Sequence, residues 1–221
     1  RVKNICIEFG PEQLLGRIYR NLGNAEKYKW RSGVGDYSEM PSLENYQKAF
    51  EIAKKHNDLI GVKYSIGNII RSFWQERGSE TSKDSVHYYA NLGLEYAVEV
   101  NSIESEAWIY MCLGYYYEWA NEYKDYDKSE YYFQKAYKMS DQVTNALKIS
   151  CITGLANMAF YNGDRYKEIE YHELNHDIIS RLNNRRRLVE SYFNLHKNYS
   201  FPLSDFNKAD ELLEKALSYR S

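Results

Sequence analysis

Apolar side chains recur along the chain at spacings of three and four residues. Two clear stripes are Tyr46, Ala49, Phe50 and Ala53, and Leu212, Leu213, Ala216 and Leu217. This spacing places side chains on one face of an α-helix, whereas a half-buried strand alternates apolar and polar positions. The pattern therefore predicts an essentially all-helical chain.

Prolines mark the places where several of these helices begin. Pro11, Pro41 and Pro202 each precede a helical stripe. Proline is well tolerated in the first turn of a helix, because its missing N–H would have no helical partner there. We expect helices to begin close to these three positions.

Two kinds of helical segment recur in alternation. The first kind carries a large apolar residue followed by a small one, so that a neighbouring helix can approach closely. Its copies are Leu15-Gly16, Ile66-Gly67, Leu113-Gly114 and Leu155-Ala156, with a weaker copy at Tyr192-Phe193. Copies of the second kind cover residues 44–50, 131–137 and 209–217. The alternation predicts repeated pairs of helices.

The third and fifth pairs carry a recognisable set of large and small residues. The set is Leu113, Gly114, Tyr117, Tyr126, Ser129, Phe133 and Ala136 in the third pair, and Phe206, Ala209, Leu213 and Ala216 in the fifth. With this set the chain resembles the tetratricopeptide repeat family, whose unit is an antiparallel helix pair of about 34 residues. The likeness extends over roughly residues 11 to 219. Three departures are Phe193, which replaces a small residue, Ile169 and Glu173 in the second helix of the fourth repeat, and apparent long loops over residues 23–40 and 76–84.

The resemblance implies an all-α fold, a right-handed α-solenoid of antiparallel helix pairs. We predict a single array over residues 1–221, with repeats at about 11–57, 58–101, 104–141, 144–183 and 186–220. Because one helix pair cannot bury its apolar face alone, neighbouring repeats share one cooperative core. The resemblance further implies that the first helix of each pair lines a concave groove, where a ligand would bind.

The residues that face the groove are predicted by aligning the first helix of each pair on its small residue. The next position holds Arg17, Asn68, Tyr115, Asn157 and Asn194, and the position one turn later holds Arg20, Arg71, Glu118, Phe160 and Lys197. Trp108 and Trp119 add aromatic surface to the middle of the predicted groove.

These residue types suit a peptide ligand. An asparagine amide both donates and accepts a hydrogen bond, as a peptide main chain does, and arginine binds carboxylates with two parallel hydrogen bonds. We therefore expect a protein or peptide segment with acidic groups or a free carboxylate. The alternative is that the same residues are simply solvated and hold no ligand.

A motif typical of zinc peptidases supports a competing hypothesis. His172 and His176 flank Glu173 in an H-E-x-x-H pattern, which on a helix can bind zinc while the glutamate activates a water. Glu190 could supply a third ligand if the next helix folds back. The apolar stripe consists of Tyr166, Ile169, Leu174, Ile178 and Leu182, and both histidines lie roughly opposite Leu174 around a helix of 3.6 residues per turn. We expect the two histidines to be exposed, which leaves no dry pocket for catalysis.

Composition and charge argue against nucleic-acid binding, a membrane-spanning helix and sites built from cysteines. The formal net charge is −2, from 29 Lys and Arg against 31 Asp and Glu, so the chain lacks the basic surface typical of nucleic-acid binding. No stretch approaches the roughly 18 apolar residues of a membrane-spanning helix. Cys6, Cys112 and Cys151 are far apart and form neither a disulfide framework nor a thiolate zinc site. A reducing, cytoplasmic location is favoured, although a chain that begins at Arg1 leaves export and processing open.

The sequence thus predicts a non-catalytic module that binds a protein or peptide in its groove, without a cofactor, as part of a larger regulatory, signalling or scaffolding protein. A peptide-sensing regulator domain is one alternative, and a zinc-dependent hydrolase is the alternative from another class. Self-association into a homo-oligomer is left open.

Overall fold

The computed structural model describes residues 12–31, 41–73, 80–120, 123–201 and 203–219. These residues form ten α-helices and one short 3-10 turn, η1 (Ser140–Gln142), without a strand. The helices are α2 (Glu12–Arg31), α3 (Pro41–Lys55), α4 (Leu59–Phe73), α5 (Glu80–Glu99), α6 (Ile103–Trp119), α7 (Tyr126–Tyr137), α8 (Asn145–Tyr161), α9 (Arg165–Ser180), α10 (Arg185–Ser200) and α11 (Phe206–Ser218). The predicted all-helical chain is confirmed.

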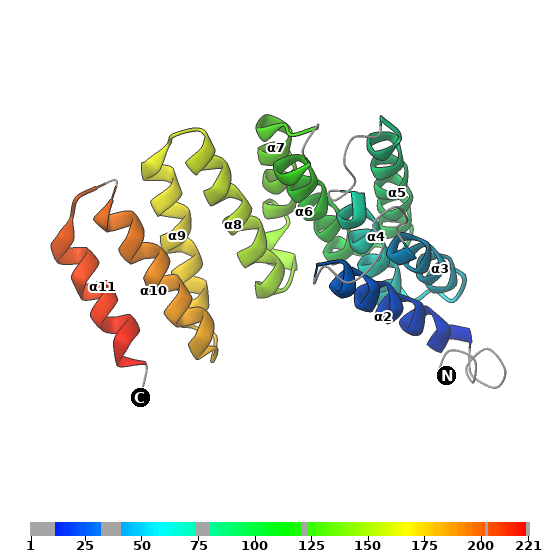
Figure 1. The fold of residues 1–221 in the computed structure, drawn as a ribbon, viewed down its shortest axis with the longest axis horizontal. Helices are drawn as coiled ribbons and strands as arrows, with labels where there is room; N and C mark the ends of the chain where they lie inside the picture. The colour runs from blue at the N-terminus through cyan, green and yellow to red at the C-terminus, as the bar shows by residue number, and fades with distance from the viewer. Residues whose placement is uncertain (1–11, 32–40, 74–79, 121–122, 202, 220–221) are drawn as a thin grey trace. The chain divides into compact units, whose positions relative to one another are not determined.

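The helices form two compact units, which divide between Asp125 and Tyr126. In unit 1, helices α2 to α6 pack each on the next, and α4 also packs directly on α6 (Figure 1). In unit 2, helices α7 to α11 pack each on the next as well. This consecutive packing confirms the all-α, solenoid-like fold class. A single array through both units remains a prediction, and the division falls within the third predicted repeat, residues 104–141.

Helix ends follow local sequence signals. Ser102, Asp164, Asn184 and Asp205 each precede a helix and accept a hydrogen bond from the backbone N–H three residues later. Such caps satisfy an amide that has no partner inside the helix. Pro41 begins α3 as predicted, whereas Pro11 and Pro202 lie outside the described residues.

Two predicted loops are shorter than the sequence suggested. Residues 23–31 belong to α2, and residues 80–84 belong to α5. In α2, the extension places Gly23 against Tyr46 of α3: a Cβ atom added to the glycine would lie 2.6 Å from the tyrosine ring. Packing between the helices therefore favours continuation of α2, and the rest of both predicted loops lies mainly outside the described residues.

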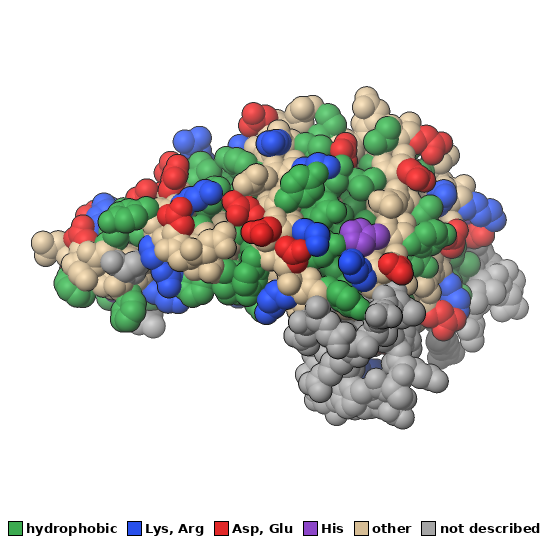
Figure 2. Space-filling view, turned by 90° about the horizontal axis from the view of Figure 1, so that it is seen from above, with side chains coloured by type: hydrophobic (Ala, Val, Ile, Leu, Met, Phe, Trp, Pro, Cys, Tyr) green, Lys and Arg blue, Asp and Glu red, His purple; other side chains and the backbone are tan. Residues whose placement is uncertain are grey.

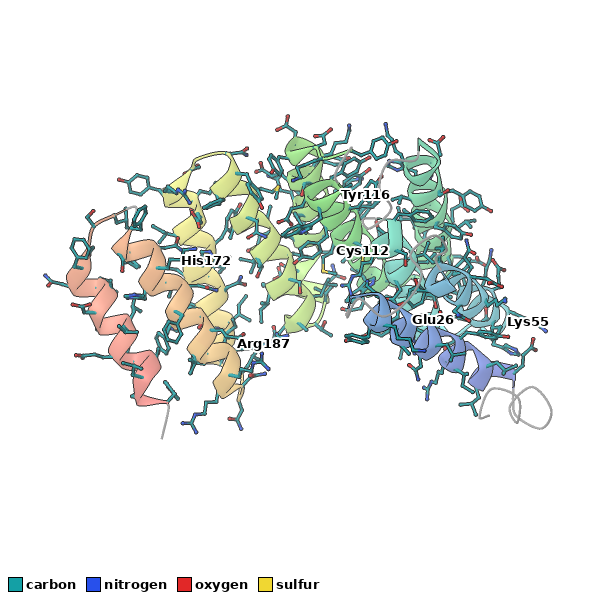
Figure 3. The ribbon with its side chains drawn as sticks, in the orientation of Figure 1. Glu26, Lys55, Cys112, Tyr116, His172 and Arg187 are labelled. Carbon is teal, nitrogen blue, oxygen red and sulfur yellow. The ribbon has the colours of Figure 1, made fainter. Side chains whose placement is uncertain are left out.

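Each unit has its own apolar core. In unit 1, large side chains such as Tyr46, Phe50 and Ile66 are fully buried between the helices. Cys112 and Tyr116 of α6 belong to this core (Figure 3). In unit 2, Phe133 of α7 is fully buried. None of the described helices combines the length and the apolar character that a bilayer crossing requires.

Candidate functional site

The predicted groove residues lie on five helices in two units. Unit 1 holds Arg17 and Arg20 on α2, Asn68 and Arg71 on α4, and Trp108, Tyr115 and Glu118 on α6. Unit 2 holds Asn157 and Phe160 on α8, and Asn194 and Lys197 on α10. Because the site is described within each unit only, a groove that runs through both units remains a prediction.

A tryptophan of α6 packs directly on the backbone of α4 in unit 1. Lys63, Gly67 and Arg71 are spaced by four residues and therefore share one face of α4. Trp108 lies on the middle position, since a Cβ atom added to Gly67 would be 2.5 Å from the indole Nε1. Tyr64 meets the indole edge to face, with ring centroids 5.1 Å apart and ring planes at 80°. The glycine thus allows Trp108 to lie close to both a lysine and an arginine.

Three cations surround these two aromatic rings. Arg20 of α2 places its Cζ 5.6 Å from the Tyr64 ring centroid. Lys63 Nζ lies 5.0 Å from the Tyr64 ring and 5.6 Å from the Trp108 ring. Arg71 Cζ lies 5.8 Å from the Trp108 ring. All three are within range of cation–π attraction, which contributes about 0.5–1 kcal/mol at an exposed site. We call these five residues the cation–aromatic cluster.

The cluster carries more positive than negative charge. Its one ion pair among the described residues joins Lys63 Nζ to Glu104 Oε1 at 3.4 Å. Arg20 and Arg71 form cation–π contacts, but no hydrogen bond or ion pair with any described residue. On the face of the molecule shown in Figure 2, acidic and basic side chains are interspersed. The cluster is therefore a local excess of positive charge in a chain of nearly neutral net charge.

The sequence prediction found three of the five cluster residues. Arg20, Arg71 and Trp108 were among the predicted groove residues, whereas Lys63 and Tyr64 were missed. The alignment considered only positions after Gly67, yet Lys63 and Tyr64 lie one turn before it and extend the same side of α4. A search in both directions from the small residue would have identified them.

One predicted groove residue is wrong. Glu118 is only 1% exposed, so a ligand in solution cannot reach it. The alignment assumed that one side of each first helix stays open. In α6, however, the consecutive residues Met111 to Gly114 and Tyr116 to Glu118 are all buried. Near the end of α6, only Tyr115, which is half-buried, and Trp119, which is 51% exposed, can reach solvent.

The remaining polar positions of unit 1 are partly engaged with the protein itself. Asn68 Nδ2 lies at the limit of hydrogen bonding, 3.5 Å from Asn24 Oδ1. The same oxygen accepts a shorter hydrogen bond, 2.9 Å, from the hydroxyl of Tyr46. Arg17 is exposed, and Tyr115 is half-buried. A peptide that binds Asn68 would compete only with a weak contact.

In unit 2, the predicted residues are spread over two helices that both pack on α9. Asn157 is half-buried, whereas Asn194 and Lys197 are exposed. Phe160 is 42% exposed, and Arg165 lies over its ring at 4.1 Å. This arginine also pairs with Glu168 at 2.8 Å. No cluster comparable to that of unit 1 forms from the predicted residues in the described part of unit 2.

The histidine pair does not face solvent as predicted. His172 is labelled on α9 in Figure 3, and its side chain is 16% exposed. His176 is also half-buried. Both share a face of α9 with Ile169, Asn175 and Ile179, which are buried between neighbouring helices. The prediction was wrong because it took only apolar residues as evidence of the packed face, whereas that face of α9 is largely polar.

Two residues of the H-E-x-x-H motif, His176 and Glu173, lie within hydrogen-bonding distance of side chains on α10. His176 Nδ1 lies 2.9 Å from Ser191 Oγ on α10, and Tyr199 donates a 2.6 Å hydrogen bond to Glu173. Glu190, the predicted third ligand, is exposed and accepts a hydrogen bond from Arg186 at 3.0 Å. Within the described ranges, no group of three or more His, Cys, Asp and Glu side chains could hold a metal ion.

Burial governs the protonation of these residues. It lowers the pKa of His172, although the nearby Glu168 acts in the opposite direction. It also lowers the pKa of His176. The hydrogen bond to Glu173, together with burial, raises the pKa of Tyr199 to about 12. The interface of α9 and α10 therefore favours neutral histidines and a protonated tyrosine.

Comparison with known proteins supports the fold. No protein-family model matches the chain, and no curated protein matches its sequence. Solved structures do match, among them BtubC (BKLC) from P. vanneervenii, with a TM-score of 0.52 and 16% sequence identity over 93% of this chain and 91% of that chain. At this identity, the likeness concerns the fold alone.

Proposed function

We propose that the chain is a non-catalytic binding module of the tetratricopeptide repeat type, which holds a protein or peptide segment on its first helices. Each predicted repeat range contains, to within one residue, two of the described helices. The direct packing of α4 on α6 supports this proposal, because the first helices of neighbouring repeats are adjacent in such an array. We further propose that it serves as part of a larger regulatory or scaffolding protein.

The observation that carries the proposal is the cation–aromatic cluster. Its side chains come from α2, α4 and α6, the three first helices of the predicted repeats in unit 1. Arg20 and Arg71 have guanidinium donors without an acceptor in the described residues. Guanidinium groups bind carboxylates strongly and with defined geometry. An acidic peptide segment would supply the missing acceptors.

A peptide-enrichment experiment tests this function. Degenerate short peptides with fixed Asp and Glu positions are compared with a matched library that carries Asn and Gln instead. We expect the immobilised full chain to enrich the acidic library, and the double substitution Arg20→Gln with Arg71→Gln to abolish that enrichment. Lys54→Gln with Lys83→Gln removes the same charge from exposed positions of unit 1 and serves as the matched control.

The outcomes separate binding at the cluster from general charge attraction. Enrichment that survives in the control and disappears in the arginine variant supports the proposal. If both variants lose it equally, net charge rather than the cluster is responsible. A chain that enriches neither library over a blank support contradicts peptide binding on this face.

A further inference from the structure

We propose that the cation–aromatic cluster recognises a phosphomonoester carried by the bound peptide, such as a phosphorylated serine. This inference rests on the function proposed above and specifies the chemical group that the cluster selects. It follows from the charge balance of the cluster, the guanidinium donors of Arg20 and Arg71, and the cations that contact the two rings.

The charge balance favours a dianion over a single carboxylate. Arg20, Lys63 and Arg71 surround the two rings, and only Lys63 is paired with a carboxylate, that of Glu104, among the described residues. A carboxylate brings one negative charge, whereas a phosphomonoester brings about −1.5 to −2 at neutral pH. The excess of cations is thus better matched by phosphate.

The available donors also suit a phosphate. A guanidinium carries several N–H donors in a fixed planar fork, and those of Arg20 and Arg71 have no acceptor among the described residues. A phosphomonoester offers three strong acceptor oxygens. Lys63 has a side chain that is only 12% exposed, and partial removal of water strengthens a charge-assisted hydrogen bond.

The aromatic rings of the cluster serve to position cations rather than to stack on a ligand. Tyr64 is contacted by Arg20, by Lys63 and by the indole. Trp108 is contacted by Lys63 and Arg71 and lies against Gly67. Tyr64 is 38% exposed, but cations contact both rings, so stacking of a nucleic-acid base, which single-strand binding requires, would compete with these contacts. The group that the cluster recognises is therefore an anion.

The test compares three degenerate peptide libraries that differ only at one fixed central residue, which is phosphoserine, glutamate or serine. Binding to the full chain is measured in solution by fluorescence anisotropy. We expect the phosphoserine library to bind about tenfold more tightly than the glutamate library, because more charge-assisted bonds form. Arg20→Gln with Arg71→Gln should remove this difference, whereas Lys54→Gln with Lys83→Gln should retain it.

Further measurements make each result decisive. The melting temperature of each variant shows whether loss of binding reflects unfolding. The double substitution Arg20→Lys with Arg71→Lys keeps the positive charge but removes the planar guanidinium. It should prefer the phosphoserine library over the glutamate library by less than the parent does, but still measurably. Equal binding of the phosphoserine and glutamate libraries overturns the phosphate inference and leaves the proposed peptide function intact. Failure of both to exceed the serine library overturns the two together. Displacement of the phosphopeptides by a single-stranded oligonucleotide of equal charge overturns the inference in favour of nucleic-acid binding.

Discussion

At the scale of single residues, glycines determine how closely two helices can approach in each unit. Gly154 of α8 lies against the buried ring of Phe133 on α7, and a Cβ atom added there would be 2.4 Å from the ring. Gly67 has the same role beneath Trp108. A methyl group at either position would require the facing ring to move, and a packed core resists such movement.

We expect Gly154→Ala to lower the free energy of unfolding by about 1–3 kcal/mol through overpacking, even though alanine is intrinsically better in a helix by up to about 1 kcal/mol. Urea unfolding followed by circular dichroism measures the change. Adding Phe133→Leu to Gly154→Ala should cost less than the sum of the two single changes, because the smaller side chain makes room for the methyl group. A variant as stable as the parent would show that the two helices separate easily.

Which sequence positions take part in the cation–aromatic cluster can be predicted in part from the alignment of the first helices on their small residue. Gly16 and Gly67 identify Arg20 and Arg71 at equivalent positions of two helices, and both arginines contribute to the cluster. Glu118 occupies the equivalent position of α6 but is buried. The alignment of the repeats predicts only the direction in which a side chain leaves its helix. Whether that side chain is exposed depends on which other helices pack around it. The contribution of Lys63 likewise depends on where Trp108 lies, which needs the packed structure.

At the scale of elements, α9 shows how a polar face can be buried. Asn175 donates a 3.0 Å hydrogen bond to Thr153 of α8, and His176 contacts Ser191 of α10. These hydrogen bonds offset part of the cost of removing the groups from water, while Asn175 Oδ1 is buried without a hydrogen-bond partner among the described residues. Hydrophobic periodicity could predict that α9 is a helix, but not which of its faces is packed, because the partners of a buried polar residue lie on other helices.

This buried polar face predicts a pH dependence of stability. Burial lowers the pKa values of His172 and His176, so the folded state binds fewer protons than the unfolded chain just below the ordinary histidine pKa of about 6.5. The free energy of unfolding should therefore be at its full value above that pH and fall as the pH decreases toward the lowered folded values. Charged neighbours are Glu168 and Lys197 for His172, and Glu173, Asp177 and Lys215 for His176.

Urea unfolding at a series of pH values between about 5 and 7.5, on either side of the ordinary histidine pKa, measures this dependence. The double substitution His172→Gln with His176→Gln should flatten it while it retains hydrogen-bonding side chains in the interface. The carboxylates of the chain provide an internal comparison, since their titration lies at lower pH. An unchanged slope in the variant would assign the pH dependence to other groups.

We also predict that the H-E-x-x-H motif of α9 does not bind zinc. The arrangement of His176, Glu173 and Glu190 with protein partners leads us to expect no stoichiometric zinc after incubation with zinc and dialysis. Elemental analysis of the dialysed protein measures the content. One equivalent of retained zinc that is lost in His176→Ala would favour the hydrolase hypothesis over the non-catalytic module.

At the scale of the whole molecule, the two units raise the question of whether the chain folds as one cooperative array. The repeat pattern predicts a single core through all repeats, whereas the described residues form two compact units that divide between α6 and α7. Unit 2 has buried residues on each of its helices, among them Phe133, Ile152, Ile179, Leu195 and Leu212. The cation–aromatic cluster belongs entirely to unit 1.

We expect residues 126–221, produced alone, to retain a helical circular dichroism spectrum and to unfold in one cooperative transition, because α7 to α11 pack consecutively around their own buried residues. In the full chain, Gly154→Ala should then lower the stability of unit 2 and leave phosphopeptide affinity at unit 1 within about twofold of the parent, since sites in separate folding units are energetically independent. A fragment without helical structure, together with a full chain in which Gly154→Ala weakens binding, would instead establish one cooperative array. Phosphopeptide binding at unit 1 would then depend on the stability of unit 2, as nearest-neighbour packing in a solenoid predicts.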